Sequence, residues 1–305
     1  MEFNQIESFL SVVKYKSFSK AAKDLYLTQP TISNNIQALE KELNTTLLNR
    51  TSKTISLTDS GKLFYKYALE LINVRDRAKF EIKDKQENIQ GMIDVSTSSI
   101  PALYILPYII RDFRKAYPNI SFNISQKNSR DIITDIIDGN ITFGIVGAKI
   151  PSRILEYMHF YEDELVLALP NTDRYSSLAC EDLNIDFIFS QDFLFRKEGS
   201  GTRIFIESSL ADLNISPDDL NIRAILDSNQ MIKKMIELGQ GVSFVSELSI
   251  RNEIKAGLIK ACKIKGLNLK RKFYFVYSKY MTLPTNVETF KDFIMNIGDE
   301  NFCSF

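Results

Sequence analysis

The chain has 305 residues, of which 44% are hydrophobic and 25% are charged, and its formal net charge is zero. These values fit a globular protein of two or three domains. A neutral chain gives no general signal for nucleic acid. Residues 1–90 nevertheless carry 14 Lys and Arg against 11 Asp and Glu, a charge of +3 that the remainder offsets with −3.

The sequence argues against secretion, a membrane span and a disulfide framework. No basic flank precedes a long apolar run at the N-terminus, so we expect no signal peptide. No stretch is apolar for the roughly 18–20 residues that a membrane helix needs, so we expect a cytoplasmic protein. The cysteines Cys180, Cys262 and Cys303 are widely separated and odd in number, which fits a reducing compartment. We expect inert thiols, with redox sensing by Cys180 and Cys262 as the minor alternative.

The single histidine, His159, lies in an apolar-flanked stretch that indicates a strand. A Ser-His-acid or Cys-His catalytic group would need this residue, so a structural histidine is the simpler interpretation. No CxxC, HExxH or clustered Cys and His spacing is present in the sequence. We therefore expect no metal, no cofactor and no enzymatic activity.

Three helices are indicated at the N-terminus. Apolar residues at spacings of three and four predict an amphipathic helix over residues 3–14. A second helix is expected from Ser19, a candidate N-cap. A third is expected over residues 30–43, with Thr28 as its cap and Pro30 in the first turn, where a missing N–H has no cost. Helix, helix, short turn and helix is the order of a helix-turn-helix motif.

The third helix has a core face and a polar face. At about 100° per residue, Ile32, Ile36 and Leu39 share one arc, and Asn34 lies almost opposite. Asn35 falls about 70° from the core arc, so the two adjacent asparagines do not share a face. Amides suit the donor and acceptor pattern of adenine, and hydroxyls suit bases or phosphates. The alternative is a solvated polar face.

A basic hairpin and a long helix are expected next. Residues 50–58, RTSKTISLT, predict a short hairpin, or wing, with Ile55 and Leu57 turned inward. Residues 59–90 contain neither Gly nor Pro after Gly61 and predict one long linker helix. Its apolar stripe favours packing against a partner chain, with folding back onto its own domain as the alternative. The stripe comprises Leu63, Phe64, Tyr67, Leu71, Val74, Ala78 and Ile82.

The helix-turn-helix order, the outward Asn34 and the basic hairpin together favour binding to double-stranded DNA. The residues that we expect to contact DNA are Ser19, Thr28, Gln29, Pro30, Thr31, Ser33, Asn34, Gln37, Arg50 and Lys53.

Residues 92–149 alternate strand, helix, strand, helix and strand, a βαβαβ pattern that predicts a parallel, helix-covered sheet. The first of these helices is expected as one helix over PALYILPYIIRDFRKAYPN (101–119), and LVLALPN and FIFSQD continue the strand pattern. Three predicted helix starts carry hydroxyls or Gly-Ser turns: STSSIP (96–101), RKEGSGTR (196–203) and DSNQ (227–230). Helix N-termini bind anions, so we expect a small anionic ligand, although each start could be an ordinary cap. The expected ligand residues are Ser98, Ser99, Ile100, Asn128, Gly147, Ser200, Gly201, Thr202, Arg203 and Asn229.

Residues 1–61 resemble the N-terminal domain of LysR-type transcriptional regulators, on FLSVVKYKSFSKAAKDLYLTQPTISNNIQALEKEL and LLNRTSKTISLTDSG. The resemblance continues through GMIDVSTSS, FGIVG, EGSGTR and ELGQGVSFV in family order. It implies DNA contacts by Gln29, Pro30 and Ser33, with Arg50 as the wing arginine. Asn34 departs from the family pattern, which favours a longer side chain there.

The resemblance also implies an α+β multidomain architecture. Its parts are a winged helix-turn-helix domain (1–58), a dimerising linker helix (59–90) and a two-lobed α/β effector domain (91–305) that resembles type II periplasmic binding proteins. We expect hinge crossings near 161–164 and 264–270, with lobe I at 91–162 and 268–305 and lobe II at 163–267. The family forms homodimers and usually homotetramers. Rival interpretations are a solute-binding protein and an enzyme that uses the cleft.

Overall fold

The computed structural model describes residues 1–50, 55–83, 89–181 and 183–297, and their side chains except at 50, 73 and 76–83. Contacts divide the chain into two compact units. The first comprises Met1–Ile89 with Lys279–Glu288, and the second comprises Gln90–Ser278 with the chain from Thr289 onward. In the described residues no helix has the length and apolar character that crossing a bilayer requires.

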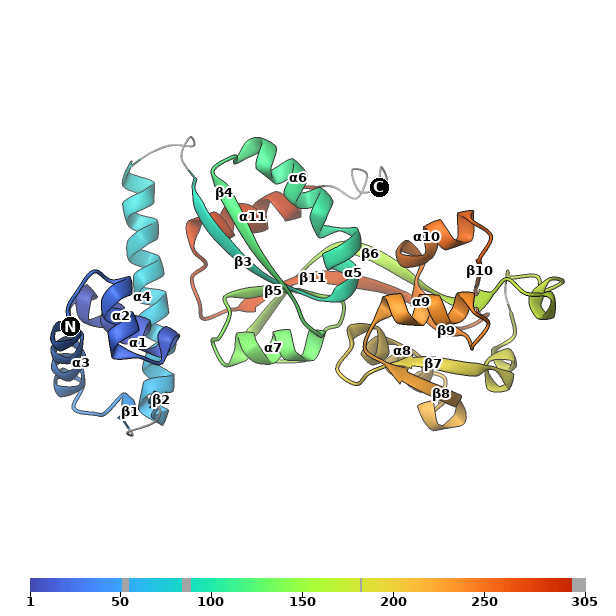
Figure 1. Ribbon diagram of the computed structural model, residues 1–305, viewed down its shortest axis with the longest axis horizontal. Coiled ribbons are helices and arrows are strands. Elements are labelled where there is room, and N and C mark those ends of the chain that lie inside the picture. The colour runs from blue at the N-terminus through green and yellow to red at the C-terminus, as the bar shows by residue number, and fades with distance from the viewer. Residues whose placement is uncertain (51–54, 84–88, 182, 298–305) are drawn as a thin grey trace. The chain divides into compact units, whose positions relative to one another are not determined.

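The first unit begins with α1 (Phe3–Tyr15), α2 (Phe18–Asp24) and α3 (Gln29–Glu42), in the expected order (Figure 1). The Thr28 hydroxyl accepts the backbone N–H of Thr31, so the predicted cap of α3 is confirmed. The predicted cap of α2 is wrong, because Ser17 accepts the N–H of Lys20 and Ser19 lies inside the helix. Ser17 directly precedes the helix, where an unpaired N–H needs an acceptor.

Apolar side chains at helical spacing hold these three helices together. One buried cluster joins Ile6 and Phe9 of α1 to Ile32, Ile36 and Leu39 of α3. Full burial of each such side chain contributes about 1.5–3 kcal/mol. That gain exceeds the cost of the two asparagines in α3, which destabilise a helix by at most about 0.7 kcal/mol each relative to alanine.

A short hairpin follows α3. Its strands β1 (Leu48–Arg50) and β2 (Ile55–Leu57) are antiparallel, with Leu48 opposite Leu57. Ile55 and Leu57 pack against the helical core, as their alternation predicts. Lys53 and the side chain of Arg50 lie outside the described residues.

The long helix α4 (Asp59–Lys83) divides its apolar residues between two faces. The inner face packs against the helical core through Phe64, Tyr65, Ala68 and Ile72. The outer face, which we call the α4 stripe, exposes Leu63, Tyr67, Leu71 and Val74. The side chains of Ala78 and Ile82 are not among those described. Folding back onto its own domain is therefore correct for one face of the helix.

The second unit is built on a seven-stranded sheet of order β10-β6-β11-β5-β3-β4, with β9 also paired to β6. β3 (Gly91–Thr97) runs parallel to β4 (Ile120–Gln126) and β5 (Phe143–Val146), as the βαβαβ pattern predicts. The helices of this part are α5 (Ser99–Tyr104), α6 (Leu106–Ala116), α7 (Ser129–Ile137) and α11 (Thr285–Asn296), of which the part from Thr289 onward belongs to the second unit. We call these elements the β3 half.

The strand β6 (Leu155–Pro170) connects two halves of this unit (Figure 1). Its first part pairs with β11 (Lys270–Ser278), and its last part pairs with β9 (Ser243–Ser246) and β10 (Ile259–Cys262). The β7 half contains β9 and β10 together with β7 (Asp192–Arg196), β8 (Asn221–Leu226), α8 (Gly201–Ala211), α9 (Asn229–Glu237) and α10 (Glu247–Lys255). Short 3-10 turns are η1 (Asp173–Tyr175), η2 (Ile185–Ser190) and η3 (Pro217–Asp219).

Two expected elements differ from the structure. The single helix expected from Pro101 is broken at Ile105 into α5 and α6, because Pro107 cannot donate the helical hydrogen bond and its ring clashes with the preceding turn. The strand expected at FIFSQD lies mostly in η2, and β7 begins at Asp192. Short apolar runs do not distinguish a strand from a helical turn by pattern alone.

Cys180 and Cys262 are joined by a disulfide, with their Cα atoms 4.2 Å apart. The expectation of two separate, inert thiols is therefore wrong. Cys262 is fully buried at the end of β10, and Lys263 donates its backbone N–H to the Cys180 carbonyl. The two cysteines are 82 residues apart in sequence, so their spacing did not predict this contact, which the fold creates by bringing the two chain segments together.

Reducing this disulfide is expected to lower stability. Closing a loop of this length contributes at most about 4.5 kcal/mol through the entropy of the unfolded chain. Thermal unfolding with and without dithiothreitol should show a lower midpoint for the reduced wild type, and no reductant effect in Cys180→Ser. An identical midpoint for oxidised and reduced wild type, with thiol titration confirming both states, would contradict this expectation.

Candidate nucleic-acid interface and ligand pocket

The outward face of α3 presents the residues expected to contact DNA. Gln29, Pro30, Asn34 and Gln37 are exposed, while Thr31 and Ser33 are half-buried. On the opposite side of the helix, Ile32, Ile36 and Leu39 are completely buried. Amides and hydroxyls therefore share the face that is turned away from the core of this unit.

Gln29 is held in one orientation by α2. The Ser19 hydroxyl donates to the Gln29 side-chain carbonyl at 2.9 Å, across the turn between the helices. This contact occupies the carbonyl and leaves the amide N–H groups of Gln29 as donors. Such donors match base acceptors in the major groove, including guanine O6 and N7. Ser19 thus positions a candidate base-reading side chain, although it was expected as a cap.

The adjacent asparagines have different surroundings. Asn34 is exposed. Asn35 donates from Nδ2 to the Ser8 hydroxyl of α1 at 2.9 Å, and Ser8 donates in turn to the Asn4 carbonyl at 2.7 Å. Asn35 therefore fixes α3 against α1, and Asn34 is the asparagine available to a partner molecule.

The two asparagines should respond differently to replacement by alanine. Asn34→Ala should change which base is preferred at one position of the target, by about 1–3 kcal/mol. Asn35→Ala should lower the free energy of unfolding by about 1 kcal/mol and leave the preferred sequence unchanged, because it removes a helix–helix hydrogen bond. Selection of bound sequences from a random DNA library, with urea unfolding in parallel, measures both. The same preferred sequence for Asn34→Ala and the wild type would refute a base contact.

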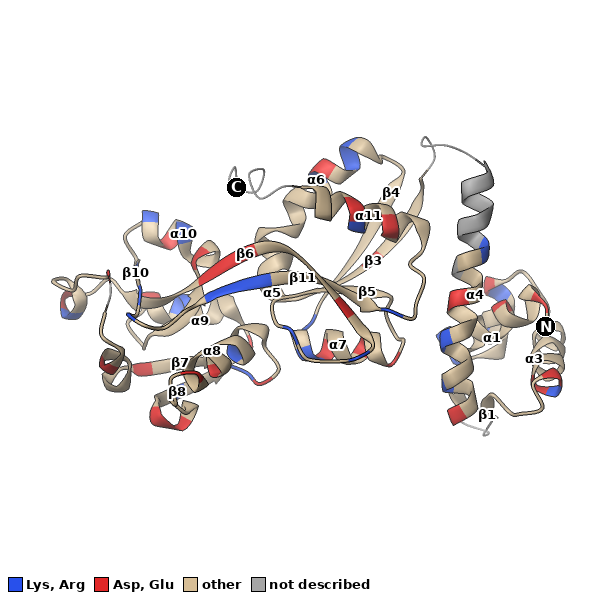
Figure 2. Ribbon diagram, turned by 180° about the vertical axis from the view of Figure 1, so that it is seen from behind, with Lys and Arg blue, Asp and Glu red and all other residues tan. Residues whose placement is uncertain are grey.

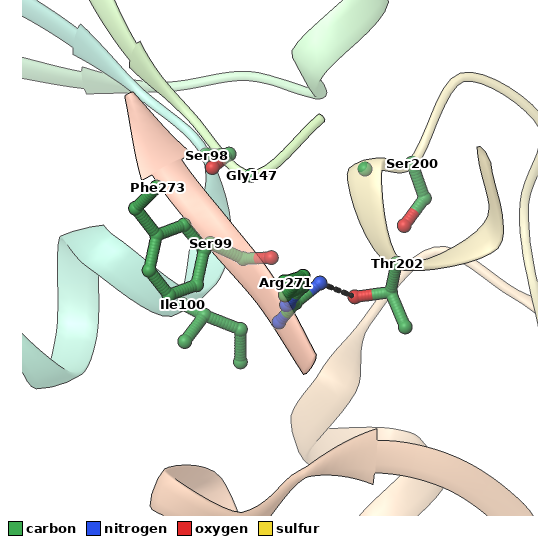
Figure 3. A pocket seen from close by; sticks show the side chains of 9 residues that line it. Ser98, Ser99, Ile100, Gly147, Ser200, Thr202, Arg271 and Phe273 are labelled. Carbon is green, nitrogen blue, oxygen red and sulfur yellow. Dashed lines mark hydrogen bonds between the residues drawn. The ribbon is translucent and has the colours of Figure 1, made fainter. Parts of the chain in front are cut away.

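Seven of the ten predicted ligand residues line one small pocket, which we call the hydroxyl pocket (Figure 3). Its lining comprises Ser98, Ser99, Ile100, Gly147, Ser200, Gly201 and Thr202, together with Arg271 and Phe273. The first three residues come from the β3 half at the start of α5, and Ser200, Gly201 and Thr202 come from the β7 half at the start of α8. Figure 3 shows Ser99 and Thr202 on opposite sides of Arg271.

The two halves approach closely because Gly201 has no side chain. A Cβ atom there would lie 2.6 Å from the Ser129 hydroxyl oxygen and 3.3 Å from the Gly147 carbonyl carbon. The Ser129 hydroxyl is itself buried, with no hydrogen-bond partner among the described atoms. The pocket volume is about 10 Å³, which is room for about one water molecule.

A buried ion pair forms the floor of the hydroxyl pocket. Arg271 of β11 lies opposite Asp163 of β6, and each is only 4% exposed. Arg271 donates from Nε to Asp163 at 2.8 Å and from Nη1 to the Thr202 hydroxyl at 3.0 Å. Asp163 also accepts the Ser246 hydroxyl at 2.7 Å. Figure 2 shows the acidic stretch of β6 beside the basic stretch of β11.

A second buried guanidinium, Arg196, lies behind the pocket wall. It donates to the Asn229 side-chain carbonyl and, at 2.8 Å, to the Asp227 backbone carbonyl. Asn229 then donates to the Ser99 hydroxyl at 3.0 Å. Nε of Arg196 has no hydrogen-bond partner among the described atoms. Desolvation, and next the positive charge of Arg271, lower the pKa of Arg196 to about 10.

Three predicted ligand residues do not line the hydroxyl pocket. Asn128 caps α7 by accepting the Asp131 N–H, and Asn229 connects Arg196 to Ser99. Arg203 pairs with Glu207 at 2.7 Å, so its charge is already compensated. Sequence reasoning missed Arg271, because one basic residue in an alternating strand carries no distinctive signal. Arg196 was visible beside the Gly-Ser-Gly turn.

Removing each buried arginine should affect stability differently. Arg271→Met should lower the free energy of unfolding by about 3–5 kcal/mol, because Asp163 stays buried without its cation. Arg196→Met should change it by less than about 1 kcal/mol, since lost hydrogen bonds are offset by relief of desolvation. The lowered pKa means that the charged form of Arg196 destabilises the fold at neutral pH, a cost relieved only as pH rises through about 10. Urea unfolding at pH 7 measures both variants, and equal losses would contradict this account.

Comparison with known families gives matches at both ends of the chain. Residues 3–62 match the model for bacterial regulatory helix-turn-helix proteins of the lysR family, and residues 86–297 match the LysR substrate binding domain. The chain is 33% identical to an HTH-type transcriptional regulator of Methanocaldococcus jannaschii, over 97% of this chain and 99% of that protein. It is 28% identical to the regulator CysL of Bacillus subtilis, over 95% of each.

Solved structures share the fold at low sequence identity. A full-length OxyR variant from Pseudomonas aeruginosa aligns with a TM-score of 0.77 at 15% identity, over 97% of this chain and 98% of that one. The QuiR effector binding domain in complex with shikimate gives 0.61 at 20% identity, over 69% and 98%. The Synechocystis CcmR regulatory domain in complex with 2-PG gives 0.61 at 23% identity, over 68% and 97%.

Proposed function

The chain belongs to the LysR family of helix-turn-helix transcriptional regulators, and we propose that a small anion in its hydroxyl pocket controls its action on DNA. The helix-turn-helix domain reads DNA through the outward face of α3. The alternative interpretation, a solute-binding protein, is disfavoured because it does not explain the helix-turn-helix domain. We assign DNA binding to residues 1–58, the linker to 59–90, and effector binding to 91–305.

The observation that carries the anion proposal is an excess of buried positive charge. Arg196 and Arg271 are 8% and 4% exposed, and Asp163 is the one acidic side chain in the buried class among the described residues. Asp163 is committed to Arg271, while Arg196 is bonded to neutral oxygens. Asp227 attracts Arg196, but desolvation and the charge of Arg271 outweigh that attraction and lower the pKa of Arg196. An anion beside Ser99 would reduce the cost of this buried charge.

Hydroxyl donors would complete the anion site. Ser99, Ser200 and Thr202 line the pocket, and α8 begins at Gly201 with its first backbone N–H groups available as donors. Domains of similar fold support a small acid as ligand, since QuiR was solved with shikimate and CcmR with 2-PG.

The closed pocket suggests how binding would act on the rest of the molecule. Its volume of about 10 Å³ is too small for an organic acid, so such a ligand must change the angle between the β3 and β7 halves. We place the lobe boundaries where β6 and β11 connect them, with lobe I at 91–162 and 268–305 and lobe II at 163–267. A ligand that fits one angle better shifts the population of arrangements and thereby the spacing of paired DNA-binding domains.

The proposed role of the hydroxyl pocket is to bind its ligand without converting it chemically. A regulator that binds DNA in this way would act in the cytoplasm. The pocket lining contains no histidine, cysteine or carboxylate, and Asp163, which pairs with the lining residue Arg271, is tied to that arginine. This composition supports ligand recognition and offers no evident general base.

Small anions should raise the thermal midpoint of the wild type. Sulfate, phosphate, acetate and glycolate are compared with sodium chloride at equal ionic strength, and a ligand at 100 times its Kd adds about 2.7 kcal/mol. Arg196→Met and Thr202→Val should lose the shift. Arg203→Met is the matched control and should keep it, because Glu207 already compensates Arg203. A shift retained in Arg196→Met and lost in Arg203→Met would overturn the assignment.

The α4 stripe is the proposed contact between two copies of the chain. Four apolar side chains recur along one exposed face of the helix, and burying them against a second copy would remove them from water. The inner face of α4 already packs on its own domain, so the two faces serve separate contacts.

A charge in the stripe should weaken self-association. Leu71→Lys should raise the dimer dissociation constant at least about tenfold, because it buries an unpaired charge in an apolar contact. Lys66→Gln, an exposed position outside the stripe, is the control. Sedimentation equilibrium measures association, and circular dichroism checks that the helices remain. Unchanged association in Leu71→Lys would place the dimer contact elsewhere.

A further inference from the structure

The second unit contains a larger cavity that shares no lining residue with the hydroxyl pocket. It has a volume of about 360 Å³, and its lining residues come from α5, α6 and β6 and, in the β7 half, from α9 and α10. These elements are labelled in Figure 1. This volume falls within the range of cavities that hold metabolites. We call it the tyrosine cavity, because Tyr104, Tyr108 and Tyr161 line it.

Positive charge gathers on one wall of the tyrosine cavity. Arg251 and Lys255 are four residues apart on α10 and therefore share a helix face. Lys255 is exposed and has no ion pair with any described residue. The lining contains no acidic residue. Two cations on one face suit an anionic group with several oxygens, such as a phosphate.

A third cation of the lining, Lys233, is buried and contacts residues of both halves. It is 8% exposed, and its Nζ lies 2.6 Å from Glu253 and 2.6 Å from the Ser249 carbonyl. Lys233 also lies 3.5 Å from the Tyr104 hydroxyl, which extends from the other half. Glu253 compensates Lys233, so among the cations of the lining it is the exposed Lys255 that has no ion pair with a described residue.

The rest of the lining suits a flat, polar ring. Tyr108 is 36% exposed at the rim, with the Arg111 guanidinium 5.6 Å from its ring centroid. A planar ligand could stack on this ring beside the Arg111 cation. Gln230 and Asn252 add side-chain amides, each with donors and an acceptor that can pair with a heterocycle edge. From this combination we propose that the tyrosine cavity is a second ligand site, which takes a phosphorylated metabolite with a planar ring, of nucleoside monophosphate type.

Such a ligand would touch both halves of the unit. Its phosphate would lie at α10 in the β7 half, and its ring would lie at Tyr108 in the β3 half. Occupancy of the cavity would then favour one angle between the halves.

Isothermal titration of the full-length protein with AMP, GMP and CMP tests the site, with inorganic phosphate and ribose 5-phosphate as ring-free probes. Saturable binding of at least one nucleotide is expected, tighter than either ring-free probe. The double variant Arg251→Gln/Lys255→Gln should weaken it at least about tenfold, because charge-assisted hydrogen bonds are lost. Tyr108→Leu should remove the advantage of the nucleotide over ribose 5-phosphate.

Two controls make the outcome decisive. Lys234→Gln/Lys265→Gln removes the same net charge from exposed positions outside the cavity and should leave binding unchanged. Thr202→Val alters the hydroxyl pocket and should also leave it unchanged, so failure of that pocket's role is distinguishable. No saturable binding of any nucleotide into the millimolar range, or equal weakening by both double variants, would overturn the proposal.

Discussion

The buried ion pair between Arg271 and Asp163 ties together the parts of the effector unit. These residues face each other on β11 and β6, the two long strands at the connection between the halves. Asp163 also binds Ser246 of β9, and Arg271 also binds Thr202 of α8. Four elements therefore converge on one pair of charges. An ion pair of this kind adds little net stability compared with apolar residues, but losing one partner is costly, so it fixes the arrangement rather than strengthening it.

Arg196 destabilises this arrangement, because its buried charge is poorly solvated and lies near a second positive charge. It lies near Arg271, and its guanidinium is bonded to neutral oxygens and buried. A fold selected for stability alone would replace it with an apolar side chain. Local features that cost stability tend to occur at functional sites, where a partner relieves the cost. An anion would be that partner. It would connect to the Arg196 guanidinium through hydrogen bonds, because Ser99 accepts from Asn229 and Asn229 accepts from Arg196.

The sequence predicted local features well and long-range contacts poorly. Periodicity placed α1, α3 and α4, and the outward angle of Asn34 followed from helical geometry. The predicted helix starts at Ser99 and Gly201 led to residues that do share a pocket. Arg271 and the Cys180–Cys262 disulfide were missed, because each depends on a pairing between segments far apart in sequence. Pro107 was a local signal for the break between α5 and α6 that the expected single helix overlooked.

The proposed control of DNA binding depends on an anion bound at the buried positive charge beside Ser99 and Thr202. Crystals soaked in sodium bromide or sodium selenate test it most directly, because both anions are located by anomalous scattering. We predict an anomalous peak in the hydroxyl pocket, within hydrogen-bond distance of the Ser99 and Thr202 hydroxyls, that is absent from crystals of Arg196→Met. Peaks confined to surface lysines, with none in the pocket of the wild type, would contradict the account.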